Sequence, residues 1–374
     1  MLYREFGSTG KKISQLGFGA MRLPEVNLNG AWYVDEDKAL DAIHHAFRNG
    51  VNYIDTAYMY CHGNSEQAVG KALKGWRDKV YVSTKLPLYD MKNESDFERL
   101  FEEQMKRLDV EHIDFYHLHS ISKDKYENVI LRFGLIEKMQ RAKESGSIGH
   151  VSFSFHDKAE VLREIIDAGF SETMLVQYNM IDRVNEEMIR YARNKGMGTV
   201  VMGPVSGGRL AIPSKHVAHI DKDRTADLPH LAMRFVASNK HVDCVLSGMS
   251  TRDMVDRNIA AVTQNTPLSD AEKELIDRYS VELNRLTDIY CNACDYCMPC
   301  PNDVNISLNF ECLIYHKVYD MKKTAQARYN LIGNSPWFPG KNASACEECG
   351  ECEPLCPQEI PIMEQLKATA KLFQ

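Results

Sequence analysis

Two runs of closely spaced cysteines are the residues of this chain whose chemistry is easiest to name. The chain has 374 residues and 11 cysteines. Eight of these cysteines form two groups of four: Cys291, Cys294, Cys297 and Cys300, and Cys346, Cys349, Cys352 and Cys356. The second group has the C-x2-C-x2-C-x3-C-P spacing typical of [4Fe–4S] ligands, because a tight turn presents three thiolates to one cluster. Four cysteines can also hold zinc tetrahedrally, so structural zinc is the alternative.

The two runs together resemble those of two-cluster ferredoxins, in which the fourth cysteine of each run binds the other cluster. The resemblance implies one cluster on Cys291, Cys294, Cys297 and Cys356, and another on Cys346, Cys349, Cys352 and Cys300. The first run departs from the pattern, with two residues instead of three before its last cysteine. A helical stretch around Leu308–Tyr329 lies between the runs. We therefore expect 286–374 to be a small, mainly helical, ferredoxin-like iron–sulfur domain, with Cys312 left over as a buried helix residue.

Four ionisable residues in the earlier part of the chain form a second candidate site: Asp55, Tyr60, Lys85 and His119. Each comes at or soon after the end of a short apolar run. A lysine in that position has to lose its hydration or find a carboxylate. Each of the others has an ordinary alternative, with Asp55 as a helix N-cap, Tyr60 as a packed ring and His119 as a structural histidine. Their joint placement is what indicates chemistry, and it depends on the elements that carry them.

Residues 1–285 alternate between short apolar runs and helix-like stretches, as parallel strands covered by helices do. The predicted strands are 15–21, 51–55, 80–85, 113–118, 148–154, 174–178, 198–203 and 242–247. The predicted helices are Asp35–Asn49, Ser65–Leu73, Ser95–Leu108, Glu127–Lys143, Lys158–Ala168, Glu186–Lys195, Leu228–Asn239 and Arg252–Val262. Eight such repeats predict a (β/α)8 TIM barrel, whose strand ends carry the active residues. A doubly wound sheet is the alternative, but no GxGxxG motif follows the first strand.

Three segments resemble the catalytic segments of aldo-keto reductases: YIDTAYMY at 53–60, VSTK at 82–85 and DFYHLH at 114–119. The resemblance covers roughly 1–285 and implies reversible hydride transfer between NADPH or NADH and a carbonyl. It implies that Tyr60 donates the proton, although a free phenol has a pKa of about 10. Lys85 would lower that pKa, Asp55 would pair with Lys85, and His119 would orient the carbonyl.

The same resemblance implies cofactor contacts in the second half of the barrel. The implied residues are Ser154, Gln177, Gly203, Pro204, Val205, Gly207, Arg209, Ser250, Arg252 and Asn258. Phe155 stands where the family usually has Asn, and Gly203 stands where many members have a stacking aromatic residue. Gly248 and Met254 align with the Lys and Arg that often bind the 2′-phosphate of NADPH. The choice between NADPH and NADH is therefore open.

The composition of the chain limits the kinds of partner that it is expected to bind. The chain has 45 basic and 52 acidic residues, a net charge of −7, and no basic run typical of nucleic-acid binding. No apolar stretch approaches the length of a membrane span, and the N-terminus has no signal-peptide pattern. Clustered thiols without an export signal indicate a reducing cytoplasm. We expect a cytoplasmic protein that acts on a small carbonyl or alcohol substrate, with a redox protein as an additional partner if the clusters transfer electrons.

Two other function classes stay open at this point. One is an electron-transfer or redox-sensor protein with a non-catalytic barrel, which four intact candidate residues argue against. The other is a lyase that forms a Schiff base on Lys85, which has no need of the neighbouring Asp55 and Tyr60. The clusters themselves have either a structural or sensing role or an electron-transfer role. Cys61, beside Tyr60, either lines the substrate pocket or is part of the packing.

Overall fold

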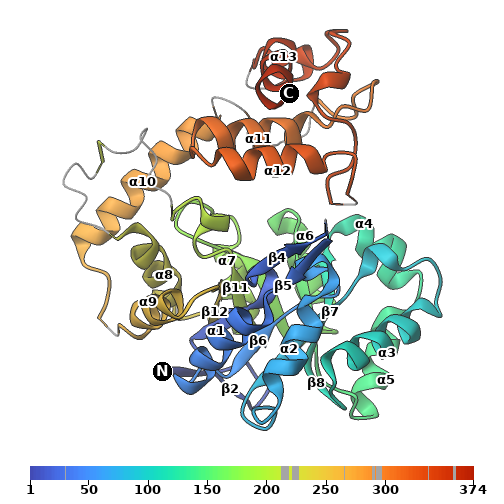
Figure 1. The fold of residues 1–374 in the computed structure, drawn as a ribbon, viewed down its shortest axis with the longest axis vertical. Helices are drawn as coiled ribbons and strands as arrows, with labels where there is room; N and C mark the ends of the chain where they lie inside the picture. The colour runs from blue at the N-terminus through green and yellow to red at the C-terminus, as the bar shows by residue number, and fades with distance from the viewer. Residues whose placement is uncertain are drawn as a thin grey trace. The chain divides into compact units, whose positions relative to one another are not determined.

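The computed structural model describes residues 1–29, 31–211, 219–220, 227–264, 266–288, 291, 297–335, 337–356 and 359–374. Cys294 lies outside the described residues. The chain divides into two compact units (Figure 1). The first consists of Met1–Pro204 and Pro229–Leu268, and the second of Val205–Leu228 and Ser269–Gln374. The segment Val205–Leu228, which the sequence places inside the barrel domain, thus groups with the cysteine-rich part of the chain.

The first unit contains a closed barrel of eight parallel strands in the order β10-β11-β12-β3-β6-β7-β8-β9. The strands are β3 (Leu16–Gly19), β6 (Tyr53–Asp55), β7 (Tyr81–Leu86), β8 (Ile113–Ile121), β9 (Ile148–Phe155), β10 (Thr173–Gln177), β11 (Gly198–Met202) and β12 (Cys244–Gly248). Each lies where an apolar run predicts a strand. The predicted (β/α)8 barrel is confirmed, and a closed barrel excludes the open doubly wound sheet.

Helices follow the strands around the barrel (Figure 1). They are α1 (Glu36–Arg48), α2 (Ser65–Leu73), α3 (Asp96–Leu108), the short α4 (Lys123–Lys125), α5 (Leu135–Glu144), α6 (Ala159–Asp167), α7 (Glu186–Asn194), α8 (Leu228–Ser238) and α9 (Arg252–Thr263). The predicted helix Glu127–Lys143 is wrong as a single element. Gly134 adopts left-handed backbone angles (φ 58°, ψ 37°), which separate α5 from the π-helical turn Tyr126–Leu131.

The strand that carries His119 is longer than its apolar run predicts. His119 was expected just after this strand, but β8 continues to Ile121, so His119 lies inside it. The register of β8 against β9 shifts between Leu118 and Ile121, and Ser120 has a positive φ of 56°. A bulge of this kind changes the direction in which a strand's side chains point.

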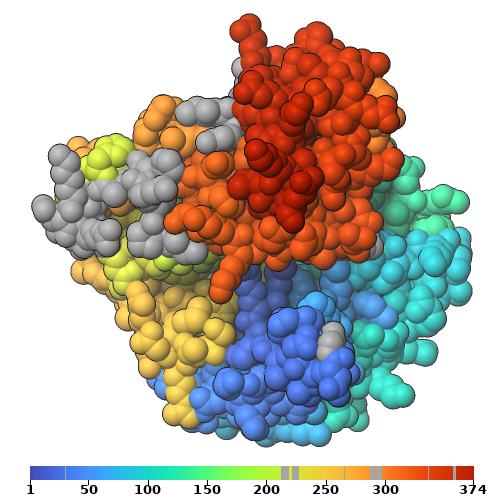
Figure 2. All heavy atoms as spheres, turned by 45° about the horizontal axis from the view of Figure 1, so that its top comes forward, coloured from blue at the N-terminus to red at the C-terminus, as the bar shows by residue number. Residues whose placement is uncertain are grey.

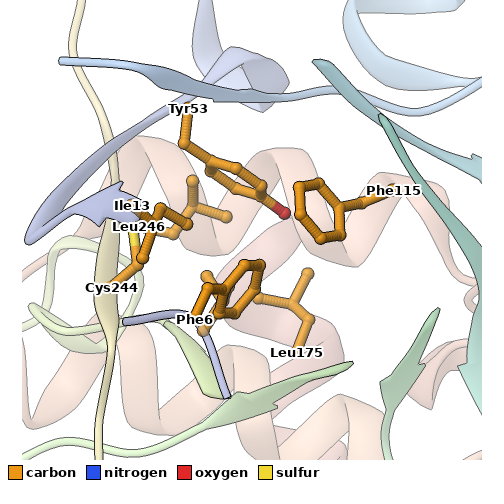
Figure 3. Packing of buried hydrophobic residues seen from close by; sticks show 8 residues of the cluster. Phe6, Ile13, Tyr53, Phe115, Leu175, Cys244 and Leu246 are labelled. Atoms are coloured by element: carbon orange, nitrogen blue, oxygen red, sulfur yellow. The ribbon is translucent and has the colours of Figure 1, made fainter. Parts of the chain in front are cut away.

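Two hairpins that the sequence pattern did not reveal precede the first helix. They pair β1 (Tyr3–Glu5) with β2 (Lys12–Ser14), and β4 (Glu25–Leu28) with β5 (Ala31–Val34). Phe6 and Ile13, at the first hairpin, join a buried cluster with barrel residues (Figure 3): Tyr53, Phe115, Leu175, Val200, Cys244 and Leu246. A Cβ on Gly198 would lie 2.5 Å from the Phe6 ring, so this close approach requires glycine.

The second unit is mainly helical. Its helices are α10 (Asp270–Asp288), α11 (Ile306–Lys317), α12 (Lys322–Leu331) and α13 (Ile362–Phe373). The stretch around Leu308–Tyr329 thus consists of two helices, which pack against each other, and α11 also contacts α13. Figure 2 shows the atoms of these last three helices, orange to dark red, in one packed body. None of the helices in the described residues is long and apolar enough to cross a membrane.

Candidate active site

A buried ion pair lies where β6 and β7 end. The Lys85 Nζ atom donates hydrogen bonds to Asp55 Oδ1 at 2.5 Å and to the Thr56 carbonyl at 2.6 Å. Ser83 donates from its Oγ atom to the second carboxylate oxygen of Asp55, at 2.8 Å. The parallel register that places Asp55 beside Ser83 explains this contact. Lys85 and Asp55 are each only 1% exposed, so each charge depends on the other for its stability in the interior.

Tyr60 and His119 lie around this ion pair. Tyr60 begins the short 3-10 helix Tyr60–Gly63 in the loop after β6. The Lys85 ammonium is 4.7 Å from the centre of the Tyr60 ring. The ring of His119 is 6.1 Å from that of Tyr60, centre to centre, and meets it edge-on at 81°. The structure therefore brings together the four residues that the sequence placed at strand ends.

The charges of the site adjust the pKa of Tyr60 in opposite directions. Burial raises the pKa of the Tyr60 phenol above its ordinary value, Lys85 works against this increase, and Asp55 adds to it. Lys85 thus acts in the expected direction but does not outweigh burial. Burial also acts to lower the pKa of Lys85, but the attraction of Asp55 and Tyr60 leaves that pKa raised. Lys85 is therefore an ammonium ion near neutral pH.

The pKa of His119 is shifted in the opposite direction from that of Lys85. Burial, followed by the positive charges of Lys85, His156 and Lys125, lowers the pKa of His119 well below its ordinary value. Lys125 donates from Nζ to the carbonyl of Ser120 at 2.9 Å, which places its charge beside the bulge of β8. His119 is therefore a neutral imidazole near neutral pH, and a neutral imidazole can donate a hydrogen bond without carrying charge.

A buried polar network behind Lys85 was not found from the sequence. Glu66 Oε1 accepts hydrogen bonds from Thr84 Oγ1 at 2.7 Å and Gln104 Nε2 at 2.6 Å. Gln104 also donates to the Lys85 carbonyl at 3.0 Å and accepts from the Tyr116 hydroxyl at 2.7 Å. This network positions the backbone of Lys85. Polar residues on the apolar faces of two predicted helices, Glu66 and Gln104, were the signal that could have revealed it.

The expected cofactor residues of the first unit make the following contacts. Ser154 Oγ accepts from the Ser120 amide at 2.7 Å, and Gln177 Nε2 donates to Asp182 at 2.7 Å. Asn258 Nδ2 donates to the Ser247 hydroxyl at 3.1 Å. Gly203 has a φ of 66°, and Gln177 side-chain atoms lie 3.7 Å from where a Cβ on Gly203 would be. Pro204, the next residue, is buried and ends the first part of this unit.

The remaining expected cofactor residues divide between the two units. In the first unit, the Ser250 hydroxyl lies 3.3 Å from the sulfur of Met254. Arg252 Nε donates to the carboxylate of Asp41 at 2.7 Å, so this guanidinium already has an anionic partner. The other three residues follow β11 in the sequence and belong to the second unit: Val205, Gly207 and Arg209.

A pocket in the second unit is lined by cysteines from both runs. They are Cys297, Cys300, Cys346, Cys349 and Cys352. Burial and the neighbouring thiols of Cys291, Cys352 and Cys356 raise the pKa of Cys297 to about 12. Within the described residues, which leave out Cys294, no group of three or more His, Cys, Asp or Glu side chains is arranged to hold a metal ion.

Cys61 and Cys312, which belong to neither cysteine run, are both buried. The sulfur of Cys61 lies 3.6 Å from the carbonyl oxygens of Ala20 and Met21. Burial raises the pKa of the Cys61 thiol to about 11. Cys61 is thus a protonated thiol packed against the backbone that follows β3. Cys312 lies on α11, as expected.

Comparison with known proteins decides the family of the chain. The model of the aldo/keto reductase family matches residues 15–280. The chain belongs to this family. The match confirms the resemblance seen in the sequence and identifies the chain as an oxidoreductase. It ends before the first cysteine run, so the cysteine pocket lies outside the part that defines the family.

Relatives of known name agree with this assignment. L-galactose dehydrogenase of Arabidopsis thaliana is 29% identical over 70% of this chain and 88% of its own length. NADH-specific methylglyoxal reductase of Escherichia coli is 26% identical over 75% of this chain and 98% of its own length. Among solved structures, aldo-keto reductase AKR11C1 from Bacillus halodurans in its holo form is 27% identical. It superposes with a TM-score of 0.63 over 74% of this chain and 96% of its own.

Proposed function

We propose that this aldo-keto reductase reduces a small aldehyde or ketone to an alcohol, reversibly, with NADPH or NADH. The observation that carries the proposal is the buried Lys85–Asp55 pair beside Tyr60, with the ring of His119 edge-on to that of Tyr60. Two relatives are named as a dehydrogenase and as an NADH-specific reductase, which supports nicotinamide-linked chemistry. The nicotinamide, when bound, supplies a hydride to the carbonyl carbon.

The chain's own residues supply the proton and stabilise the charge that develops on the carbonyl oxygen. The Tyr60 hydroxyl transfers its proton to that oxygen, and the resulting phenolate is stabilised by the ammonium of Lys85. Asp55 and the Thr56 carbonyl hold Lys85 in place and keep it charged. His119, a neutral imidazole, donates a hydrogen bond that orients the carbonyl. The proton on Tyr60 is restored from solvent, because its side chain is only partly buried.

Residues near the strand ends of the barrel would hold the nicotinamide end of the cofactor: Ser154, Gln177 and Gly203. No side chain extends from position 203, and the Gln177 side chain lies next to it. Asn258, Ser250 and Arg252 are proposed for the adenosine end, and Val205, Gly207 and Arg209 for the phosphates. Asp41 competes with a 2′-phosphate for the guanidinium of Arg252. The proposed cofactor is therefore either NADH or NADPH.

A Schiff base on Lys85 is disfavoured by the same geometry. An amine that attacks a carbonyl has to be neutral, which requires a lowered pKa. Burial acts to lower the pKa of Lys85, but the Asp55 and Tyr60 side chains keep it raised, and two oxygen atoms accept two of its three protons. The oxidoreductase proposal is therefore preferred to the lyase, and the buried Lys85–Asp55 pair beside Tyr60 disfavours a non-catalytic barrel.

We also propose that the cysteine-rich tail holds two [4Fe–4S] clusters as a ferredoxin-like domain. The pocket supports this, since it brings Cys297 and Cys300 of the first run together with Cys346, Cys349 and Cys352 of the second, and these include the four cysteines implied for one cluster. The other set is proposed on the cysteine spacing alone, as Cys291, Cys294, Cys297 and Cys356. Such clusters exchange single electrons, which makes a redox protein a candidate partner. Their thiolates also call for a reducing compartment such as the cytoplasm.

The test is an anaerobic absorbance titration of the whole protein. NADPH or NADH is added first and a small aldehyde second. We expect the nicotinamide band to disappear only after the aldehyde, and Tyr60→Phe to lower kcat by at least about a hundredfold with little change in cofactor affinity. Tyr58→Phe, in the same loop, is the matched control. Carbonyl reduction at the wild-type rate by Tyr60→Phe would refute the assignment. Bleaching of the iron–sulfur band by nicotinamide alone would place the clusters on the electron path.

A further inference from the structure

Two basic side chains follow the barrel strands that carry His119 and Ser154. They are Lys125, in the short helix α4 after β8, and His156, directly after β9. We propose that the carbonyl substrate carries an anionic group, a carboxylate or a phosphate, that binds to Lys125 and His156. The inference deepens the proposed function and rests on it, since it takes the carbonyl to lie at Tyr60 and His119. All of these residues belong to the first unit.

The bulge of β8 is in contact with both basic residues. Lys125 Nζ donates a hydrogen bond to the carbonyl of Ser120, the residue after His119, at 2.9 Å. The His156 amide donates to the Ile121 carbonyl at 3.0 Å, where the register of β8 against β9 shifts. Both residues are also close enough to His119 to contribute to the lowering of its pKa. They therefore lie next to the histidine that is proposed to orient the carbonyl.

The protein compensates the charge of Lys125 only in part. The residue is half-buried, and burial lowers its pKa below the ordinary value, whereas Asp124 acts to raise it. Because the pKa is lowered overall, the ammonium loses more hydration than its neighbours replace. An anion bound beside Lys125 would supply the missing stabilisation, since charge-assisted hydrogen bonds to carboxylates and phosphates are stronger than neutral ones.

His156 adds a neutral hydrogen-bond donor to the charge of Lys125. The residue is accessible to solvent. Desolvation by the surrounding protein, followed by the charges of Lys125 and Lys85, lowers the pKa of His156 to about 4. The ring is therefore neutral near pH 7 and has one N–H group, which can donate a hydrogen bond to an anion.

The carboxylates of the same two loops have partners of their own. Asp157 accepts hydrogen bonds from the backbone amides of Lys123 and Lys158, at 2.8 Å each. Asp124 accepts from the side-chain amide of Asn128 at 2.7 Å. The ionisable side chains that act most strongly on the pKa of the site histidine are, in contrast, all basic. A site whose neighbouring charges have one sign attracts a substrate of the opposite sign.

The experiment compares anionic and neutral aldehydes of matched shape. The full chain is assayed with NADPH and NADH on ortho-, meta- and para-carboxybenzaldehyde against their methyl esters, and on glycolaldehyde phosphate against glycolaldehyde. We expect kcat/KM to be at least about tenfold higher for the anionic member of a pair. A preference for an acid over its ester identifies a carboxylate substrate, and a preference confined to the phosphate pair identifies a phosphate.

Variants of the two loops locate the source of this preference. Lys125→Gln should reduce it about tenfold, because the substitution removes the charge that meets the anion, and His156→Ala should reduce it about threefold. The two residues lie in different loops, so either variant tests the site if the other does not fold. Lys125→Arg keeps the charge and should retain most of the preference. Lys123→Gln is the matched control and should stay within about twofold of the wild type, because exposed Lys123 pairs with Glu164 at 3.6 Å.

Three results would overturn the inference. They are a wild type that reduces the neutral and the anionic aldehydes equally well, a preference that survives in both Lys125→Gln and His156→Ala, and an equal loss of preference in Lys123→Gln. A wild type that reduces none of the aldehydes with either nicotinamide would instead refute the proposed function, which distinguishes the two failures.

Discussion

Lys85 keeps its charge in the barrel interior because its ammonium group donates hydrogen bonds to oxygen acceptors there. Asp55 Oδ1 and the Thr56 carbonyl accept two of its hydrogen bonds, and the Tyr60 ring faces the ammonium. An unpaired ammonium at this depth would lower its pKa and lose its proton. The pair therefore contributes both to the stability of the folded chain and to the chemistry of Tyr60.

Asp55→Asn tests this dependence. The substitution removes the negative charge but leaves an oxygen near Lys85, so we expect a loss of about 3 kcal/mol in the free energy of unfolding. Ser83→Ala removes one hydrogen bond to the same carboxylate and should cost about 1 kcal/mol. Urea denaturation of the wild type and both variants measures the difference. An Asp55→Asn variant as stable as the wild type would contradict the interpretation.

The lowered pKa of the buried His117 predicts how the free energy of unfolding depends on pH. Its pKa is lowered to about 4, first by burial, against about 6.5 in an unfolded chain. The folded state prefers the neutral ring, so the contribution of His117 to stability is complete above pH 6.5. It is lost as the pH falls from 6.5 toward 4, because the unfolded state then binds the proton first.

Denaturant unfolding at pH 7 and pH 5 measures this effect. Between these pH values His117 should lower the free energy of unfolding by roughly 2 kcal/mol. The other histidines contribute to the wild-type change as well, so the comparison is with His117→Gln. The variant should lose less stability than the wild type over the same range. An identical pH dependence in both proteins would show that His117 is not responsible.

Among the elements, the hairpin of β1 and β2 closes one end of the barrel core. Phe6 contacts the rings of Tyr53 and Phe115, with ring centres 6.2 Å and 4.9 Å away (Figure 3). Gly198 at the start of β11 leaves the space that the Phe6 ring fills. A short element outside the eight strand–helix repeats is therefore a full part of the packed interior.

Phe6→Ala should accordingly destabilise the chain as a core truncation does, by about 3–5 kcal/mol. Val184→Ala is the control, because Val184 is 61% exposed and its loss should change stability by less than about 0.5 kcal/mol. Both are measured by urea denaturation. The KM for the carbonyl substrate should not change in either variant that remains folded. A Phe6→Ala variant within 1 kcal/mol of the wild type would rule out this role of the hairpin.

At the scale of the whole molecule, the chain combines a family barrel with a second, mainly helical unit. The second unit contains the cysteine pocket and also the loop with Arg209. The pocket takes residues from the two runs because α11 and α13 each supply part of its wall, through Ile306 and through Met363 and Leu366. Cysteines far apart in the sequence thereby reach one place.

Iron and sulfide analysis tests the proposed clusters. The anaerobically purified wild type should hold about eight iron atoms per chain, as two [4Fe–4S] clusters require. Cys300→Ser should lose up to half of the iron, because it removes a ligand of one cluster. Cys312→Ser, which changes a buried cysteine of α11, should retain nearly all of it. Tightly bound zinc in place of iron would instead support a structural zinc site.

Much of the barrel and of its candidate site was predictable because the signals are local. Strand ends follow from short apolar runs, and parallel strands bring their carboxyl ends to one rim, so Asp55, Lys85 and His119 converge without further information. The break at Gly134 and the extension of β8 past His119 were not predictable in this way. They depend on how a helix and a strand fit the neighbours they pack against.

By itself the sequence determined the barrel repeat, the four ionisable residues at its rim and the two thiol-rich runs, since residue type and spacing along the chain are enough for each. Only the tertiary structure decided what surrounds them. Gln104 and Glu66 support Lys85, Tyr315 and Tyr319 lie against Arg209, and Cys300 faces the second run. Each of these contacts joins residues far apart in sequence, whose meeting depends on packing between elements.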